Sequence, residues 1–418
     1  MTSPFQYIDE VENFYLARKS LKIEYQVAEN TTVIDPATAE HIELLTSLGP
    51  RKSKLSLFGV LNKCTTFTGV RLLRSNLYQP PIDKTVIEDR LNLVEELIND
   101  MPFYNSLRNI LTRFPDLDSV LNLCVKKPEL SISNAQIDAK IDRMVALKQI
   151  LQLLPTFHEI LSKSESTICV KAVRMLHRHV HNSSLLLEMM QLVLIDNTNI
   201  GGRAAAASQQ RLSRMMAVKQ DVNGLLDLAR TTFCEYVEQL EAEVERVSSA
   251  HDVAMKLANS SKGFCIQMNN QRHYKVNINK LPDEFLRIVK NKAGITFVTQ
   301  EFVVIDSLAK DSLVEISKMS NAILNELLSE VREYIGFLYS LSETIATLDM
   351  LVAFANVSMN EEFVKPEFGD SHVIRGGRHP ILEKVRMDVT PNDTMLEPLS
   401  RLQVLTNNIN NINNNNNK

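Results

Sequence analysis

The 418-residue chain contains no tryptophan, only 6% aromatic residues and five cysteines. The cysteines stand far apart, at positions 64, 124, 169, 234 and 265, and no Cys-x-x-Cys occurs. An odd, scattered set of this kind excludes a disulfide framework and a zinc ribbon, and indicates reduced thiols. No apolar run reaches the ~18 residues of a membrane span, and the first residues lack the apolar core of a secretion signal. The sequence therefore predicts a soluble intracellular protein without a metal site.

Aliphatic residues supply most of the hydrophobic content, and they recur every three or four positions between about residues 36 and 198. This period is typical of amphipathic helices and predicts a multi-helix domain. Before it, alternating β-branched and polar residues over positions 24–35 predict a pair of strands. Asp35 followed by Pro36 predicts the start of the first helix, with Asp35 as its N-cap.

Two longer amphipathic patterns lie further along, over residues 215–250 and 303–357. Each predicts one continuous helix, and at a rise of ~1.5 Å per residue the two would span ~54 and ~80 Å. Between them the apolar period falls to two, over residues 263–268, 273–278 and 294–298. The sequence therefore predicts two helical arms that carry a small β-rich insert at residues 251–300, within a mainly α protein.

The insert is basic, whereas the chain as a whole is acidic. Residues 251–300 hold eight Lys or Arg against three Asp or Glu, a net charge of +5 in a chain whose total is −4. A local basic patch on an acidic body is suited to phosphate contacts, although an exposed β module can also carry lysines for solubility alone. The candidate DNA-binding residues are Lys262, Arg272, Lys275, Lys280, Lys290 and Lys292.

Two other clusters of polar residues do not predict chemistry. His177, His179 and His181 alternate, so on a helix they point in different directions and cannot share a metal ion. Glu238, Glu241 and Glu245 follow helical spacing among apolar residues, which is typical of a solvated helix face and not of paired catalytic carboxylates. Signatures of a catalytic serine or cysteine are also missing, so no catalytic residue is predicted.

Several longer motifs carry a family resemblance. They are Ser56-Leu57-Phe58-Gly59-Val60-Leu61-Asn62, Thr68-Gly69-Val70-Arg71-Leu72-Leu73-Arg74-Ser75-Asn76, Gln79-Pro80-Pro81-Ile82-Asp83 and Ile87-Glu88-Asp89-Arg90-Leu91, then Gly376-Gly377-Arg378-His379-Pro380-Ile381-Leu382-Glu383. In order and spacing they resemble the MutS family of DNA mismatch-recognition and recombination ATPases. Leu348-Asp349-Met350-Leu351 and Pro366-Glu367-Phe368 are most similar to its meiotic branch, the fourth eukaryotic homologues.

The resemblance implies a domain order. Residues 1–23 would end a connector domain, 24–200 form the core, 201–250 and 301–358 the two lever helices, and 251–300 the clamp that touches the DNA backbone. Residues 359–406 would begin an ATPase domain, and 407–418 would be a disordered polyasparagine tail. The mismatch-reading domain is expected to be absent.

The resemblance also implies a function. The expected role is stabilisation of branched recombination intermediates such as Holliday junctions towards crossovers, on meiotic chromosomes in the nucleus. The expected partners are double-stranded or branched DNA and the fifth MutS homologue, in a heterodimer. DNA mismatch repair, or a helical scaffold that does not bind DNA, are the alternatives.

Nucleotide chemistry is not expected of this chain. Family members bind ATP and Mg²⁺, yet no Gly-x-x-x-x-Gly-Lys-Ser/Thr occurs here, and the strand that should precede it runs into asparagines. By comparison with the family pattern, the chain is expected to be truncated before the phosphate loop. Val389 and Asn392 correspond to the adenine side of the family's nucleotide site, but Val389 stands where several relatives carry a stacking aromatic. Without phosphate contacts, this edge should bind nucleotide poorly.

Overall fold

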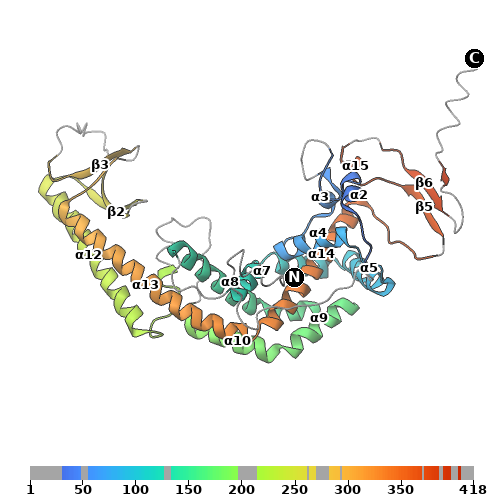
Figure 1. Ribbon diagram of the computed structural model, residues 1–418, viewed down its shortest axis with the longest axis horizontal. Coiled ribbons are helices and arrows are strands. Elements are labelled where there is room, and N and C mark those ends of the chain that lie inside the picture. Colours follow the sequence, from blue (N-terminus) through green and yellow to red (C-terminus); the bar gives the residue numbers. More distant parts are fainter. Residues whose placement is uncertain are drawn as a thin grey trace, which may run out of the picture. The chain divides into compact units, whose positions relative to one another are not determined.

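The computed structural model describes residues 31–48, 55–126, 133–195, 214–260, 263–269, 282–291, 294–369, 371–385, 389–396 and 403–405. Helices dominate these residues, and two small antiparallel sheets accompany them (Figure 1). The mainly α class with a small β insert is therefore confirmed. The chain divides into two compact units, residues 1–20, 122–148 and 184–334 (unit 1) and residues 21–121, 149–183 and 335–418 (unit 2).

Unit 2 is built around one apolar helix, α14 (Ile335–Glu361). It packs against α3 (Leu57–Leu61), α4 (Phe67–Tyr78), α5 (Lys84–Asn99), α6 (Met101–Leu111) and α9 (Thr167–Arg178). With a mean hydropathy of 1.3 over its most apolar window, α14 is long and apolar enough to cross a membrane. Its neighbours bury most of that window instead, which makes it the core helix of the unit.

A buried carboxylate joins α14 to the start of α4. Asp349 is 0% exposed, and its two oxygens accept hydrogen bonds from the backbone N–H and the hydroxyl of both Thr65 and Thr66, at 2.7–3.0 Å. Thr66 is also the N-cap of α4, because its hydroxyl accepts from the N–H of Gly69 at 3.0 Å. A Cβ on Gly69 would lie 2.3 Å from an oxygen of Asp349, so only glycine fits there. Burial raises the pKa of the adjacent Cys64 thiol to about 12, with Asp349 as a second cause.

The predicted first helix is confirmed as α2 (Pro36–His41), which Asp35 caps through a 3.0 Å bond from the N–H of Thr38. The strand pair predicted for residues 24–35 is not found in residues 31–35, the part of this range that the structure describes. Residues 24–30 lie outside the described residues, and only Thr31 makes a β-bridge, to Pro81. The remaining helices before α9 are α7 (Leu117–Val125) and α8 (Asn134–Leu161), and α10 (Val180–Val193) follows it.

Unit 1 contains the first long helix, which begins later than predicted. α12 runs over Gly224–His251, not from residue 215, because Asn223 caps it by accepting from the N–H groups of Leu225 and Leu226. The buried guanidinium of Arg230 donates hydrogen bonds to the carbonyls of Met215 and Val218. These carbonyls therefore have hydrogen-bond partners although they are not part of a helix. The apolar period of the sequence does not indicate such a contact.

The second predicted arm is two helices, not one. α13 covers Gln300–Arg332 and α14 follows from Ile335. At the break, the N–H groups of Glu333 and Tyr334 bond three residues back, to Glu330 and Val331, which tightens the last turn. The apolar spacing continues across this break, so the period gave no sign of it.

The last segment of unit 2 contains the second small sheet. Strands β5 (His372–Gly377), β6 (Asn392–Leu396) and β7 (Gln403–Leu405) form an antiparallel sheet in that order. A short helix, α15 (Leu382–Val385), lies between β5 and β6 in sequence. Gly376 adopts a positive φ of 60° and donates its N–H to the carboxylate of Asp393 at 2.6 Å.

Candidate nucleic-acid interface

The predicted basic insert is a four-stranded antiparallel sheet with a core of its own. β1 (Met255–Ser260), β2 (Gly263–Asn269), β4 (Gly294–Val298) and β3 (Leu286–Asn291) pair in that spatial order. Two of the three predicted strands match β2 and β4, the third (273–278) lies outside the described residues, and β1 and β3 were not predicted. Because β1 and β3 are edge strands with exposed polar positions, their apolar alternation is weak.

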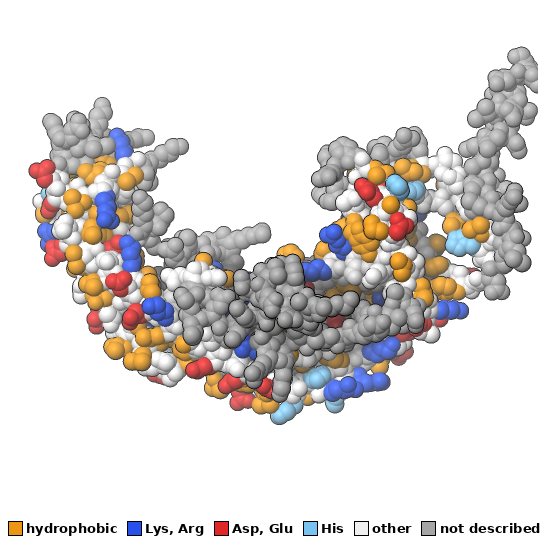
Figure 2. Space-filling view, in the orientation of Figure 1, with side chains coloured by type: hydrophobic (Ala, Val, Ile, Leu, Met, Phe, Trp, Pro, Cys, Tyr) orange, Lys and Arg blue, Asp and Glu red, His pale blue; other side chains and the backbone are white. Residues whose placement is uncertain are grey.

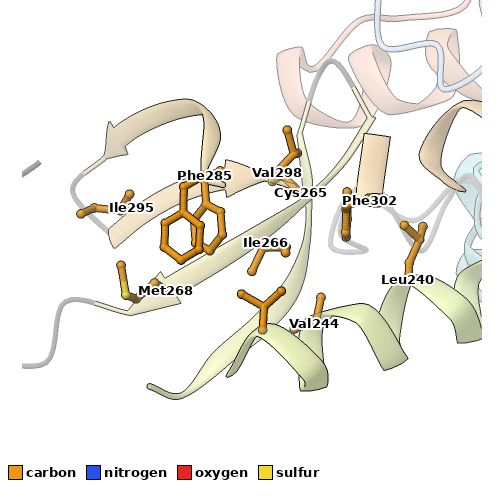
Figure 3. Close-up of a cluster of buried hydrophobic side chains, with 11 residues drawn as sticks. Leu240, Val244, Cys265, Ile266, Met268, Phe285, Ile295, Val298 and Phe302 are labelled. Carbon is orange, nitrogen blue, oxygen red and sulfur yellow. The ribbon is translucent and has the colours of Figure 1, made fainter. Parts of the chain in front are cut away.

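The sheet packs on the ends of both long helices. Its apolar face meets Leu240, Val244 and Val247 of α12 and Phe302 of α13 in one buried cluster. Figure 3 shows Leu240, Val244 and Phe302 beside the side chains of the strands. The rings of Phe285 and Phe297 stack with centroids 3.8 Å apart. The insert is therefore a folded module continuous with the helices that carry it.

Glu243 of α12 fixes the point where the chain leaves the sheet and enters α13. Its carboxylate is buried, with 4% of the side chain exposed, and accepts two hydrogen bonds from Arg246 at 2.6 and 2.8 Å. It also accepts a bond of 2.7 Å from the hydroxyl of Thr299, which is the N-cap of α13. The hydrogen bonds from Arg246 are the main cause that holds the pKa of Glu243 below its ordinary value. The helical spacing of the acidic residues in the sequence did not single out Glu243.

A second carboxylate fixes the start of β2. Asp306 of α13 is 7% exposed and accepts a 3.1 Å bond from the N–H of Phe264, while Lys310 binds its other oxygen at 2.5 Å. Gly263, at a φ of 128°, packs so closely on Lys310 that a Cβ would lie 2.4 Å from the ammonium group. Two carboxylates, one from each helix, thus hold the junction between β4 and α13 and the start of β2.

We expect the Glu243→Gln variant to lose about 1–3 kcal/mol of unfolding free energy, because the amide presents N–H groups to Arg246. The sign of the pH dependence follows from the lowered pKa. The stabilisation is present above the unfolded-state value near 4.5 and is lost as pH falls through the lower folded-state pKa. Urea unfolding at several pH values should show the difference between wild type and variant shrinking in that acidic window. Glu241→Gln, on the exposed face of the same helix, is the control; an equal loss in both would contradict the role of Glu243.

The structure describes one of the six predicted DNA-binding residues. Lys290 is exposed and lies in β3. Lys262, Arg272, Lys275, Lys280 and Lys292 lie outside the described residues. Lys256 in β1 and Arg287 in β3 are also exposed cations, and neither was selected from the sequence. All three described cations lie on the two edge strands, where lysine also serves to block edge-to-edge pairing.

The predicted nucleotide-side residues lie in unit 2. Val389 is half-buried, and Asn392 is exposed at the start of β6, where it pairs with Gly377. The neighbouring Arg378 and His379 have structural contacts. Arg378 donates to the carbonyl of Glu361 at the end of α14 at 2.7 Å and pairs with Glu383 at 3.2 Å, whereas His379 accepts from the N–H groups that open α15.

The two clusters set aside earlier are also placed. Glu238, Glu241 and Glu245 are all exposed on α12, as a solvated face requires. His179 is the C-cap residue of α9, and His177 and His181 flank the junction between α9 and α10. The ring of His179 packs on that of Phe337, with centroids 5.3 Å apart. The three imidazoles therefore occupy different structural positions.

Comparison with known proteins agrees with this architecture. The family model "MutS domain III" matches residues 37–355. The chain is 32% identical to MutS protein homolog 4 of Mus musculus over 96% of its own length and 41% of the relative's. It is 28% identical to MutS protein homolog 4 of Saccharomyces cerevisiae over 93% of the chain and 44% of the relative. It is 26% identical to the DNA mismatch repair protein MutS of Thermotoga petrophila, over 90% and 43%. The chain thus spans under half the length of these relatives.

Proposed function

The chain belongs to the MutS family, and from this premise we propose that it binds the phosphate backbone of DNA through the basic insert at residues 251–300. The observation that carries the proposal is the insert itself, a sheet that packs on the ends of two long helices and is held there by carboxylates from both. Its net charge of +5, in a chain whose total is −4, favours polyanions there. Backbone contacts position a protein on DNA without reading its sequence.

We further propose that the DNA is a branched meiotic recombination intermediate, such as a Holliday junction, that is stabilised towards a crossover. Support comes from the similarity to MutS protein homolog 4 of mouse and yeast over more than nine-tenths of the chain. On the same basis, the proposed partner is a second MutS homologue, the fifth of the eukaryotic set, and the proposed location is the nucleus.

Mismatch repair is the second candidate, because the chain is also 26% identical to a bacterial DNA mismatch repair protein MutS over 90% of its length. The two candidates differ in the DNA they require. Preference for a four-way junction over a mismatched duplex of equal length and charge supports the recombination role, and the reverse preference supports repair. Equal failure to bind either would favour the third candidate, a helical scaffold that does not bind DNA.

ATP hydrolysis is not proposed for this chain. The 418 residues contain no Gly-x-x-x-x-Gly-Lys-Ser/Thr, the sequence that cradles the phosphates and places Mg²⁺ in nucleotide-binding loops. Val389 and Asn392 offer at most an edge to an adenine ring. ATP and Mg²⁺ are therefore not proposed as ligands of these residues.

The salt dependence of DNA binding tests the proposed interface. We expect the logarithm of the association constant to fall linearly with the logarithm of salt concentration, and Lys290→Ala to lower that slope by about 1. The exposed position of Lys290 on an edge strand makes a folding defect a poor explanation of such a change. Fluorescence anisotropy with a labelled junction measures the slope. Binding that does not respond to salt, or a slope unchanged in the variant, would reject a phosphate contact at this position.

A further inference from the structure

The outward face of α9 carries a row of cations that the proposed insert interface does not use. Lys171, Arg174 and Arg178 are exposed at positions i, i+3 and i+7, so they line one side of the helix. Each stands two residues after a buried one (Cys169, Ala172 and Leu176), which turns it about 200° away from the core. Figure 2 shows Lys, Arg and His side chains gathered along the edge where Figure 1 draws α9.

The charge of this segment is not balanced locally. Residues 166–183 hold three Lys or Arg and no Asp or Glu, a net charge of +3 in an acidic chain. Lys171 has a carboxylate 3.3 Å away, that of Asp89 on α5. Arg174 and Arg178, in contrast, have no carboxylate within 4 Å among the described residues. His177 and His181 lie beside them and are also exposed.

Helix stability alone does not explain the row. Arg178 and His177 lie in the last turn of α9, where positive charge complements the helix dipole. Arg174 and Lys171 lie closer to the N-terminus of α9, beyond the last turn in which the helix dipole stabilises a positive charge. Lys84 and Lys163, two exposed lysines of unit 2, each form an i,i+4 ion pair, with Glu88 and Glu159. Arg174 and Arg178 have no such partner among the described residues and direct their charge towards solvent.

We propose that the row Lys171–Arg174–Arg178 on α9 is a second contact for the sugar–phosphate backbone of DNA, separate in the chain from the insert. The proposal rests on the DNA-binding function proposed above for its ligand, and on the geometry of α9 for its site. From residue 171 to 178 the row extends ~10 Å, and duplex DNA carries one negative charge per ~1.7 Å of axis, so several phosphates fall within reach. Guanidinium groups suit phosphate oxygens because they can bind two of them in one plane.

DNA is favoured over an acidic protein as the occupant because of the shape and composition of the face. A protein interface relies on apolar anchors buried in a pocket at its centre. The row is instead a line of charged side chains on the side of the helix opposite its buried residues. The pocket that borders it at Lys171 is also lined by Asp89 and Glu343, which would repel an acidic side chain of a protein partner. Sequence-independent binding to DNA needs positioned cations and little else.

The test compares four forms of the full chain by fluorescence anisotropy on one labelled four-way junction and one duplex, over a range of salt. They are wild type, Arg174→Glu/Arg178→Glu, the insert variant Lys256→Glu/Lys290→Glu, and the control Lys84→Glu/Lys163→Glu. The control makes the same change of charge at exposed positions of unit 2, each within an i,i+4 ion pair. Circular dichroism and urea unfolding establish that each variant is folded.

We expect the α9 variant to bind DNA at least about tenfold more weakly than the control and to lower the salt slope by about 2. A loss in the α9 variant without one in the insert variant would refute the proposed insert interface and leave the α9 contact standing. A loss in the insert variant alone would overturn the α9 contact. If the α9 variant binds DNA like wild type but no longer binds immobilised polyglutamate, the row is a site for an acidic protein and the proposal is wrong.

Discussion

The Asp349→Asn variant is expected to lose about 2–4 kcal/mol of unfolding free energy, because a fully buried acceptor of hydrogen bonds is replaced by a group that is half donor. Two of the groups facing it are the backbone N–H groups of Thr65 and Thr66, at 2.8–3.0 Å. A hydroxyl can rotate to accept from an amide, but a backbone N–H cannot. At least one N–H at the start of α4 would then face an amide N–H or have no partner.

The loss should be measured by urea unfolding of the whole chain, with far-ultraviolet circular dichroism as the signal. Asp83→Asn provides the matched control, since Asp83 is also an aspartate at a helix start but is exposed. Its oxygen accepts from the N–H and hydroxyl of Thr85, which water can replace. The control should lose much less stability. Equal losses would mean that burial does not amplify the contribution of Asp349.

Gly69 extends the same reasoning to the family motif that contains it. The residue lies in the first turn of α4, so neither a loop turn nor a positive φ explains why it is a glycine. The absence of a side chain allows Asp349 to approach closely, because the carboxylate and Cβ of Asp349 lie within 3 Å of the position that a Cβ would take. The residues of the motif at 68–76 and the motif at 348–351, far apart in the sequence, are thus two sides of one contact.

The largest effect on binding is expected from the double charge reversal Lys275→Glu/Lys280→Glu, which should abolish junction binding at physiological salt. Both lysines belong to the six residues predicted from the sequence, within the +5 insert. Each reversal removes a cation and adds a repulsive charge, and counterion release makes such losses multiply. We expect the affinity to fall by more than about a hundredfold, towards the limit of detection by anisotropy.

Lys84→Glu/Lys163→Glu again serves as the control, because it alters the net charge of the chain by the same amount in unit 2. If both double variants weaken binding equally, the effect comes from net charge and the insert is not the interface. If Lys275→Glu/Lys280→Glu binds like wild type, the scaffold interpretation takes precedence. Hydrogen exchange of β2 and β4, which pair directly with each other, would show whether the sheet remains folded in the variant.

Much of the architecture could be read from the sequence because apolar periodicity records which residues must be buried. The helix cap at Asp35, the change of period between two long helices, and the solvated glutamates of α12 are all local features, and the structure confirms them. Where the apolar period misled, the hydrogen bonding of the backbone had changed without any change in the apolar spacing. Arg230 donates hydrogen bonds to the carbonyls of Met215 and Val218, which lie before the first residue of α12. The turn at Glu333 ends α13, although the apolar spacing continues beyond it.

Sequence alone was enough to predict the mainly α class, the basic insert between two helical segments and the resemblance to the MutS family, because these depend on composition, period and ordered motifs along the chain. The polar residues that hold the molecule together become visible only in the folded chain. Glu243 and Asp349 look in sequence like a surface glutamate and a helical aspartate, yet each is buried and accepts bonds from a segment far along the chain. The cost of burying a charge is recovered only when its partners arrive from elsewhere in the fold, and no local pattern records where those partners are.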